Sequence, residues 1–514
     1  MPEEYRIYKA AIEKWDHLHI QLLSLKYYTD IVKLNFYEEL TKLFEMFKEI
    51  QIGFDAYLQK RKLNSPRLHF LSNNELLEML SKGRDPKQVE PYFSKLFASI
   101  SKPEFNNRGE IIAIFATNNE RLELHRSKQK LFKINLNLNN LNRNAFDIEL
   151  QAYLAECIKF LPSNEQQLLL LQNIFVDLIE AQNIIAHLIQ KGSTSIEDIS
   201  WTSQFRHYWS NDNFFVRLFN VSILYGYEYL ALTKPFVKTD KVKNLHIQLA
   251  LFQYQNFACL LQGPAATGKS ETIKEFSKTL AQNSIEQLES LIIGTFLAGT
   301  ILCLDEFNRL SSATMSTTIN HILGIYQAKH SHNLFYNMHG LELSVNPLSA
   351  FFLSQNPNYV GRSALPSNTS SVAKIIDVPT ADFEAIAEEY FLLASFNCSH
   401  QLQSVFSQCS AIVSPMRHYD FSLRTLLANV KNAIWLQNEN SFLSEMGVTV
   451  KAAQNLLSSM FTVVDSKIFS KILLLSKSKP MITDSETAYK TALQQICETL
   501  NLATTPAFIN ACYN

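Results

Sequence analysis

Residues 260–270 constrain this chain more than any other stretch, because they read LLQGPAATGKS. The pattern GxxxxGK[ST] suits phosphate binding: its glycines let the backbone curl until N–H groups face phosphate oxygens, while Lys269 adds a positive charge. The apolar residues 257–261 predict a strand before the loop, and residues 271–280 predict an amphipathic helix whose N-terminus faces the anion. This order of strand, phosphate-binding loop and helix predicts an α/β unit that binds a nucleotide. Its candidate nucleotide-binding residues are Gly263, Pro264, Ala265, Ala266, Thr267, Gly268, Lys269, Ser270 and Glu271.

A second apolar run, residues 300–306, ends in the two carboxylates of Asp305 and Glu306. Downstream of a phosphate-binding loop this is a Walker B pattern. Asp305, together with the Ser270 hydroxyl, would hold Mg²⁺, and Glu306 would polarise the attacking water. The alternative is a buried strand that ends in a solvated acidic pair, and the upstream loop favours Walker B. Residues 349–355 predict a further strand, after which Asn356 and Pro357 by themselves indicate only a turn.

Length and composition bound the class of protein. A chain of 514 residues suggests roughly three or four domains, and 46% hydrophobic residues suffice for large cores. A net charge of −1 and a pI of about 6.9 give no electrostatic signal for nucleic acid, so we expect no such partner. The seven cysteines form no CxxC pair, which favours a reducing, intracellular setting. We find no signal-peptide pattern and no run of about 18 apolar residues, and so expect no membrane span.

The segments on either side of the P-loop unit predict mainly helices. Ser72 or Asn73 can cap a helix, and the nearby His69 has no metal-ligand partner, so we expect it to be packed or on the surface. Residues 111–115 predict a short strand. The aromatic residues of 201–209 are expected to pack a helix against a neighbour.

Near the C-terminal end, Asp420 or Ser422 can cap another helix, and Arg424 lies about one turn inside it. Arg424 is either a surface charge or a second sensor that reaches the nucleotide. Periodicity does not decide between these two roles.

Several motifs, in this order, resemble the dynein heavy chain along nearly the whole sequence. Residues 63–78, LNSPRLHFLSNNELLE, resemble the linker segment FPRFYFLSNDELLEIL, and residues 225–230, YGYEYL, resemble the segment that joins linker and first AAA+ module. The DEFNR motif beside NPxYxGR is far more particular to dynein than a phosphate-binding loop alone. The further matches are residues 263–272 to GPAGTGKTET, 305–309 to DEFNR, 356–366 to NPGYAGRSELP and 418–424 to HYDFGLR.

The resemblance implies a mostly α chain with one α/β P-loop domain. It implies a helical linker rod over 1–230, an AAA+ large subdomain with a parallel sheet over 231–385 and a small helical lid subdomain over 386–475. Residues 476–514 resemble the lead-in to a second AAA+ module, and we expect the chain to be a truncated or fragmentary heavy chain. The implied ligands are ATP and Mg²⁺. The implied catalytic residues are Glu306, Asn356 as first sensor and Arg424 as second sensor.

Three positions depart from the dynein pattern. The segment between the P-loop and Walker B is shorter than in dynein, which puts an edge strand of the sheet in question. Ala266 and Ser270 replace Gly and Thr, and both changes are mild. Lys374 stands where dynein has an arginine that is a candidate finger toward a neighbouring site. Lysine does not reproduce the planar fork of arginine, which argues against finger function here.

The resemblance therefore predicts an ATP-binding motor module that couples hydrolysis to linker movement in microtubule-based movement. Turnover by this chain alone is expected to be weak, because a neighbouring module completes an AAA+ site. The expected partners are other dynein chains or AAA+ modules, with microtubules contacted only through parts outside this sequence. The expected location is cytoplasmic, on the cytoskeleton or in the cilium or axoneme. The alternatives are a stand-alone AAA+ switch or remodeller, and a degenerate dynein-derived nucleotide-binding or interaction protein without motor activity.

Overall fold

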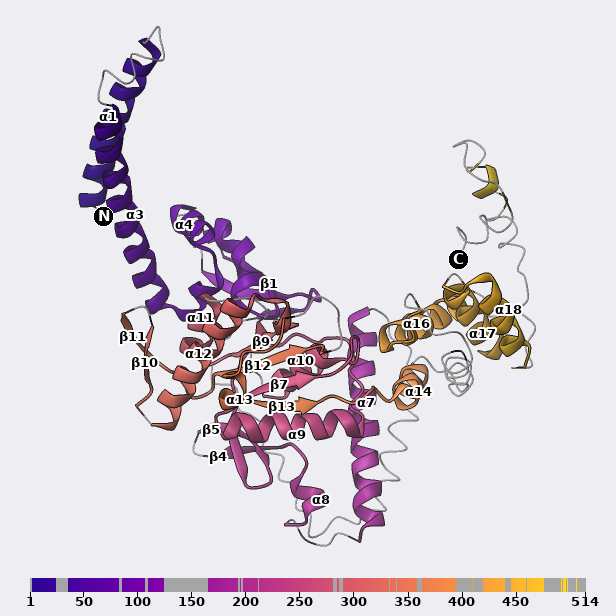
Figure 1. Cartoon of the computed structure of the whole chain (residues 1–514). Helices are drawn as coiled ribbons and strands as arrows, with labels where there is room; N and C mark the ends of the chain where they lie inside the picture. Colours follow the sequence, from indigo (N-terminus) through magenta and orange to yellow (C-terminus); the bar gives the residue numbers. More distant parts are fainter. Residues whose placement is uncertain are drawn as a thin grey trace.

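The computed structural model is a mostly helical chain with one parallel β-sheet at its centre (Figure 1), which confirms the coarse fold class predicted from the sequence. Every structural statement below concerns the residues that the structure describes. These are residues 2–24, 36–82, 86–106, 110–123, 165–192, 195, 197–210, 212–280, 284–285, 290–331, 333–338, 340–357, 363–393, 409, 419–439, 445–458, 460–475, 491, 493–495, 497 and 505.

The parallel sheet has the strand order β13-β7-β12-β9-β8. The strands predicted before the P-loop, before Asp305 and before Asn356 are confirmed as β7, β9 and β12. Because parallel strands end at the same edge, the P-loop and both of these polar residues meet there. The strands are β7 (Ala258–Gln262), β8 (Ser284–Ile285), β9 (Ile301–Leu304), β12 (Ala350–Gln355) and β13 (Ala373–Asp377).

Helices cover both faces of this sheet, as a buried parallel sheet requires. On one face α9 (Asp240–Tyr254) and α10 (Lys269–Thr279) enclose alternate strand residues such as Cys259 and Cys303. On the other face α11 (Ser290–Ala298) and α12 (Ser312–His330) pack around Leu260, Leu302 and their neighbours. The alternation of side chains along each strand therefore separates two cores.

The edge strand that the sequence put in question is present in a short form. In β8, Ser284 pairs with Ile301 and Ile285 pairs with Leu302 in parallel register. The strand matters because it covers backbone groups of β9 that would otherwise lie at an open sheet edge. Residues 281–283 and 286–289 lie outside the described part of the chain.

The N-terminal region begins with a helical hairpin that projects from the body of the molecule (Figure 1). Its helices, α1 (Pro2–Ser24) and α3 (Phe36–Asn64), pack on each other along a narrow apolar seam. The turn η1 (Pro66–Phe70) and helix α4 (Asn73–Lys82) follow.

Ser72, rather than Asn73, is the cap of α4. Its hydroxyl accepts from the N–H of Glu75 at 3.3 Å, and the Glu75 carboxylate accepts from the N–H of Ser72 at 2.9 Å. This reciprocal pair is a capping box. His69 is packed, as one of the two expected outcomes, and burial together with the charge of Lys62 lowers the pKa of this imidazole to about 4.

Two small antiparallel sheets interrupt the helices of residues 1–230, so the helical rod expected for this region needs correction. The strand predicted at 111–115 is confirmed as the central strand β2 of the first sheet. The elements are η2 (Pro86–Tyr92), α5 (Phe93–Leu96), β1 (Ile100–Phe105), β2 (Ile111–Ala116), β3 (Arg121–Glu123), α7 (Glu165–Gln190), α8 (Ile199–Thr202), β4 (Arg206–Ser210), β5 (Asn213–Leu218) and β6 (Val221–Leu224).

The helix expected for the aromatic residues of 201–209 is mostly wrong, because α8 ends at Thr202 and β4 begins at Arg206. Tyr208 pairs with Phe215 and Trp209 with Phe214 across the strands. Such cross-strand aromatic pairs stabilise a sheet, and they depend on residues outside the run itself.

Helix α7 is long and apolar enough over Gln166–Gln190 to cross a membrane by length and composition. It is the one described helix that meets this test, and one such helix is weak evidence for a span. In the structure α7 stands beside α9 and α14 (Figure 1).

Four helices near the C-terminal end form a cluster with its own core, which includes Phe391, Leu426 and Val448. Just before the second of them, the Asp420 carboxylate accepts from the N–H of Ser422 at 3.0 Å and from the Thr425 hydroxyl at 2.9 Å. The helices are α14 (Phe383–Leu393), α16 (Leu423–Glu439), α17 (Glu445–Leu457) and α18 (Val463–Leu475). The remaining described elements are η4 (Phe307–Arg309), β10 (Phe335–Met338), β11 (Leu341–Ser344) and α13 (Thr369–Val372).

Candidate nucleotide-binding site

The P-loop connects β7 to α10, and at several of its positions the backbone conformation or the space available favours a residue with no side chain or a small one. Gly268 has φ +85°, in the left-handed region that favours glycine, and immediately precedes α10. Gly263 is required for space, because a Cβ there would lie 2.8 Å from the Val378 carbonyl oxygen. Ala266 adopts φ +56° although it carries a Cβ. A left-handed alanine costs roughly 1–2 kcal/mol relative to the ordinary helical region.

The Lys269 ammonium is folded onto the loop itself. Its Nζ donates to the carbonyl oxygens of Gly263 at 3.0 Å and Pro264 at 2.5 Å. Burial lowers the pKa of Lys269, while the nearby carboxylates of Asp305 and Glu306 act in the opposite direction. A positive charge is therefore held in the mouth of the loop, with acceptors that a phosphate oxygen can replace.

Asp305 lies directly after β9 and faces the start of α10. Its carboxylate accepts hydrogen bonds from the hydroxyls of Ser270 and Ser354. Burial alone would raise the pKa of Asp305, but these bonds, the N–H of Glu306 and the charge of Lys269 together lower it. The P-loop hydroxyl and the Walker B carboxylate are thus brought together, with the carboxylate ionised.

Glu306 adopts φ +48°, which turns the chain sharply after Asp305. Its N–H donates to the Ser354 hydroxyl oxygen at 2.9 Å. Its carboxylate forms an ion pair with Arg309 of η4, within the DEFNR motif. The strained backbone is held by these neighbours, as is common where a side chain must be aimed.

Asn356 follows β12 and is almost fully buried at the same edge of the sheet. Its carbonyl oxygen accepts from the side-chain amide of Asn308 at 3.0 Å. One residue earlier, Gln355 accepts from the N–H of Gly263 at 3.3 Å and donates to the Gln262 side chain at 2.6 Å. The end of β12 is therefore tied both to the P-loop and to the Walker B turn. The sensor role of Asn356 stays a prediction.

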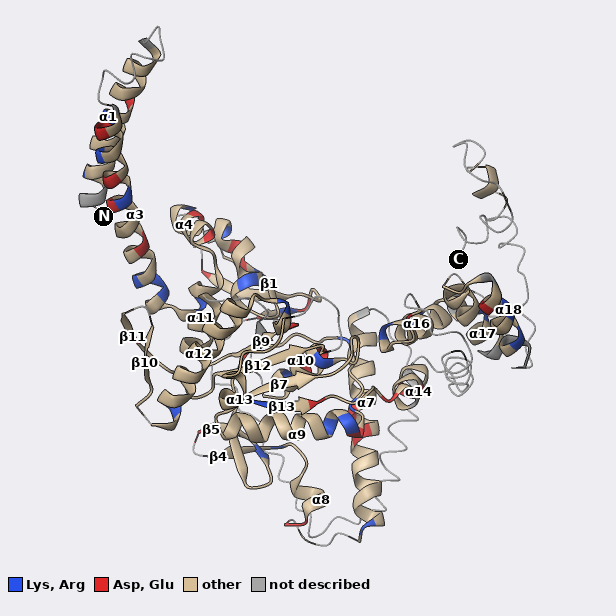
Figure 2. Cartoon of the chain, viewed as in Figure 1, with Lys and Arg blue, Asp and Glu red and all other residues tan. Residues whose placement is uncertain are grey.

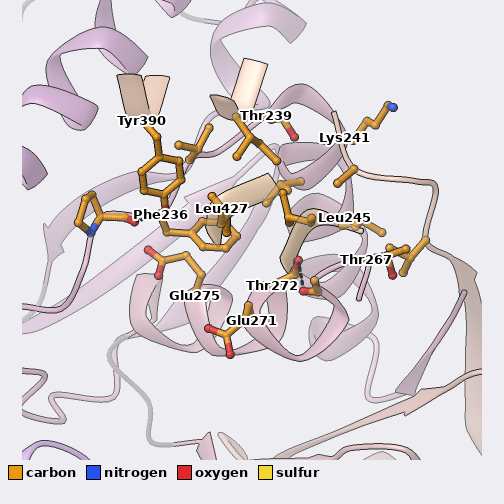
Figure 3. Close-up of a pocket in the computed structure, with 18 of the residues that line it drawn as sticks. Phe236, Thr239, Lys241, Leu245, Thr267, Glu271, Thr272, Glu275, Tyr390 and Leu427 are labelled. Carbon is orange, nitrogen blue, oxygen red and sulfur yellow. Dashed lines mark hydrogen bonds between the residues drawn. The ribbon is translucent and has the colours of Figure 1, made fainter. Parts of the chain in front are cut away.

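A cavity of about 230 Å³ lies beside the P-loop, between α9, α10 and the C-terminal helices (Figure 3). Phe236, Leu245, Tyr390 and Leu427 give it an apolar wall, and Gly268 and other P-loop residues line it as well. The Tyr390 hydroxyl donates to the Pro235 carbonyl at 3.0 Å, which joins α14 to the segment just before α9.

Two predicted residues lie apart from this cluster. Arg424 is exposed in the first turn of α16 and does not line the cavity, although the adjacent Leu423 does. Its role as second sensor stays a prediction. Lys374 is exposed on β13, and its Nζ lies 4.5 Å from the centre of the Phe257 ring.

Sequence reasoning missed Ser354 and the apolar wall of the cavity. A polar residue at the end of a buried strand was a usable signal for Ser354. The wall comes from segments far apart in the sequence, so no local pattern pointed to it.

Comparison with known proteins decides the family. Residues 225–514, more than half of the chain, match the family described as the hydrolytic ATP binding site of the dynein motor region. This chain belongs to the dynein heavy chain family. Residues 1–157 match a second family of the same proteins, the dynein heavy chain N-terminal region 2. Both matches fall where the sequence resembles the first AAA+ module and the linker.

The curated relatives of this dynein chain include axonemal heavy chains. It is 27% identical to mouse dynein axonemal heavy chain 1 over 90% of its length, and 28% identical to human dynein axonemal heavy chain 12 over 83%. The chain spans only 13% and 16% of these two relatives.

The dynein site fits a nucleotide with Mg²⁺. The hydroxyl of Ser270 and the carboxylate of Asp305 are hard oxygen donors within hydrogen-bond reach of each other. Among the described residues no group of three or more His, Cys, Asp or Glu is placed to hold a metal. Mg²⁺ needs no such group, since it typically takes one or two protein ligands and completes its shell with phosphate and water.

Proposed function

We propose that this chain is the ATP-binding module of a dynein motor, and that it binds ATP with Mg²⁺ and takes part in its hydrolysis. The observation that carries the proposal is the contact between Ser270 and Asp305, directly beside the buried Lys269 ammonium. Three groups from two separate motifs are thereby assembled at one point, where a triphosphate needs them.

In this proposal each residue of the cluster has a distinct task. Lys269 exchanges its carbonyl acceptors for phosphate oxygens, and Ser270 and Asp305 hold the Mg²⁺. The ion neutralises charge on the phosphates when it is bound. Glu306 orients the attacking water after its carboxylate leaves Arg309. Most of the rate enhancement then comes from positioning and electrostatics.

The cavity beside the loop would receive the nucleoside. Its apolar wall suits a flat base, and its position between the sheet and α14 and α16 makes the pocket depend on both parts. A nucleotide would therefore change how the C-terminal helices sit on the sheet, as expected for a lid subdomain.

Helix α7 is the element that would couple nucleotide binding to the linker movement proposed for a dynein motor. Figure 2 shows basic positions at the start of α9 beside acidic positions of α7. Lys238 and Lys243 lie 3.3 and 3.7 Å from the Glu180 carboxylate, and α14 packs against the same helix. A shift of α14 on nucleotide binding would therefore change its packing against α7, which belongs to the linker-like region.

The parts played in the whole protein are proposed from the relatives. They comprise microtubule-based movement, association with other dynein chains or AAA+ modules, and a location on the cytoskeleton or in the axoneme. The axonemal heavy chains among the relatives support this location.

Titration with Mg·ATP tests the proposal, with calorimetry as the readout. We expect wild-type protein to bind and Lys269→Ala to lose at least about tenfold in affinity, because a charge-assisted contact to phosphate is removed. Lys274→Ala is the matched control: it removes a half-exposed lysine of the same helix, whose Nζ lies 3.3 Å from the Glu271 carboxylate. If wild type and Lys269→Ala bind ATP with equal affinity, or if neither binds it, the proposed ATP binding at the P-loop is refuted. The non-motor alternative would then remain.

A further inference from the structure

The Ser354 side chain connects both Walker B residues. Its hydroxyl donates to the Asp305 carboxylate, and its oxygen accepts from the N–H of Glu306 at 2.9 Å. Ser354 itself is fully buried, whereas Asp305 is exposed and Glu306 is half-buried. A hydroxyl can donate once and accept at the same time, and this one does both within the site.

Strand register places the hydroxyl there. Leu353 of β12 pairs with Leu304 of β9 in the parallel sheet. The next residues of the two strands, Ser354 and Asp305, therefore lie side by side where the strands end. All residues of β12 from Ala350 to Leu353 are apolar. Ser354 is therefore the first polar side chain of the strand, and it lies next to the Asp305 carboxylate.

The two bonds restrain two different parts of the turn. The first holds the Asp305 carboxylate, which also accepts from Ser270. The second holds the backbone at Glu306, where φ is +48°. Loss of the hydroxyl would leave the carboxylate with one fewer donor and the strained N–H with one fewer acceptor.

We propose that Ser354 is a positioning residue of the nucleotide site, which sets the Asp305 carboxylate against Ser270 so that the pair is ready to receive Mg²⁺ with the nucleotide. The inference rests on the proposed binding of ATP. Ser354 itself touches neither phosphate nor metal in this proposal. It acts through Asp305, in the manner of outer-shell hydrogen bonds that orient metal ligands.

The Mg²⁺ dependence of nucleotide affinity separates this role from a general packing role. ATP affinity is measured by calorimetry on the full chain, once with Mg²⁺ and once with EDTA, and the ratio of the two is the Mg²⁺ gain. For Ser354→Ala we expect the gain to fall about tenfold, the lower end of what loss of an outer-shell partner does to metal affinity. Affinity in EDTA should be nearly unchanged, because the P-loop remains intact.

Two further variants make the comparison sharp. Ser354→Thr keeps the hydroxyl and should retain the gain. Ser349→Ala removes a buried serine just before the other end of the same strand, whose hydroxyl donates to the Asn346 carbonyl at 2.8 Å. It should leave the gain unchanged even if it lowers thermal stability. If Ser354→Ala does not fold, Ser354→Cys takes its place, because a thiol is similar in size to a hydroxyl but is only a weak hydrogen-bond donor and acceptor.

Each outcome decides the matter. A full Mg²⁺ gain in Ser354→Ala or Ser354→Cys overturns the proposal, while ATP binding by wild type still stands. A loss of affinity that is equal with Mg²⁺ and with EDTA also overturns it, because that pattern indicates packing. Absence of ATP binding by wild type refutes the proposed function, and the present inference falls with it.

Discussion

Arg67 and Glu228 form a two-pronged ion pair that joins η1 to the segment just before the P-loop unit. One guanidinium nitrogen of Arg67 donates to a Glu228 carboxylate oxygen at 3.1 Å, and the other pairs with the second oxygen. Arg67 also donates to the Leu96 carbonyl at 3.0 Å. Two residues before Glu228, the N–H of Gly226 donates to the carbonyl of Leu280, directly after α10. The YGYEYL segment thus links the N-terminal region to the end of the P-loop helix.

Replacement of Glu228 by glutamine should loosen this link. The neutral amide cannot match the guanidinium fork, so we expect the free energy of local opening around η1 and α5 to fall by about 1–3 kcal/mol. Hydrogen exchange of the amides in residues 66–97 measures this. Glu104→Gln is the control, since its pair with Arg121 is exposed and should contribute less than about 1 kcal/mol. Unchanged protection in Glu228→Gln would contradict the role of the pair.

A second prediction concerns the contact between η1 and α11. A Cβ on Gly294 would lie 2.6 Å from Cε1 of Phe70 and 2.9 Å from Cβ of His69. Gly294→Ala should therefore lower the free energy of unfolding by about 1–3 kcal/mol through overpacking. In a Phe70→Ala background the same change should cost less, because the clash with the Phe70 ring is gone, although the close contact with Cβ of His69 remains. Denaturant unfolding of the four variants gives the coupling energy, and strict additivity would show that the contact is not tight.

Lys329 should make stability depend on pH. Its ammonium is buried and donates to the carbonyls of Pro347, at 3.0 Å, and of Ser349. Burial lowers the pKa of Lys329 to about 7. Between pH 7 and the unfolded value near 10.5 the unfolded chain binds more protons, so stability rises with pH across that window and is flat below it.

The measurement for Lys329 is denaturant unfolding at pH 7, 8 and 9. The slope owed to this lysine is at most about 1.4 kcal/mol per pH unit. Lys329→Met should remove it, and the difference between the two proteins cancels other groups that titrate in the same range. Parallel pH profiles for the two proteins would show that the lysine is not the source.

The left-handed backbone of Ala266 leads to a prediction for the P-loop. Ala266→Gly removes roughly 1–2 kcal/mol of strain but adds unfolded-state entropy of about 0.4–1 kcal/mol, so stability should be unchanged or rise slightly. Ala266→Val should destabilise the loop and weaken ATP binding, because a β-branched residue tolerates φ +56° poorly. Thermal melting and ATP titration check both, and a tolerant Ala266→Val would indicate that the loop changes conformation.

Local patterns predicted the strands before the P-loop, before Asp305 and before Asn356, because a short apolar run that ends in a polar residue can be recognised within a few neighbouring residues. They also predicted Ser72 as one of two options for the N-cap of α4. They failed for residues 206–210, where the strand depends on aromatic partners in β5, which a local window does not contain.

By itself the sequence determined the dynein family, through motifs spread along the chain, and it predicted the P-loop and the Walker B pair, since each motif consists of residues close together in the chain. The tertiary structure alone decided which distant groups meet: Ser354 with Asp305, Arg67 with Glu228, and Tyr390 with Pro235. The reason is physical. Backbone spacing follows from adjacent residues, whereas strand register and the packing of helices arise from contacts throughout the folded chain.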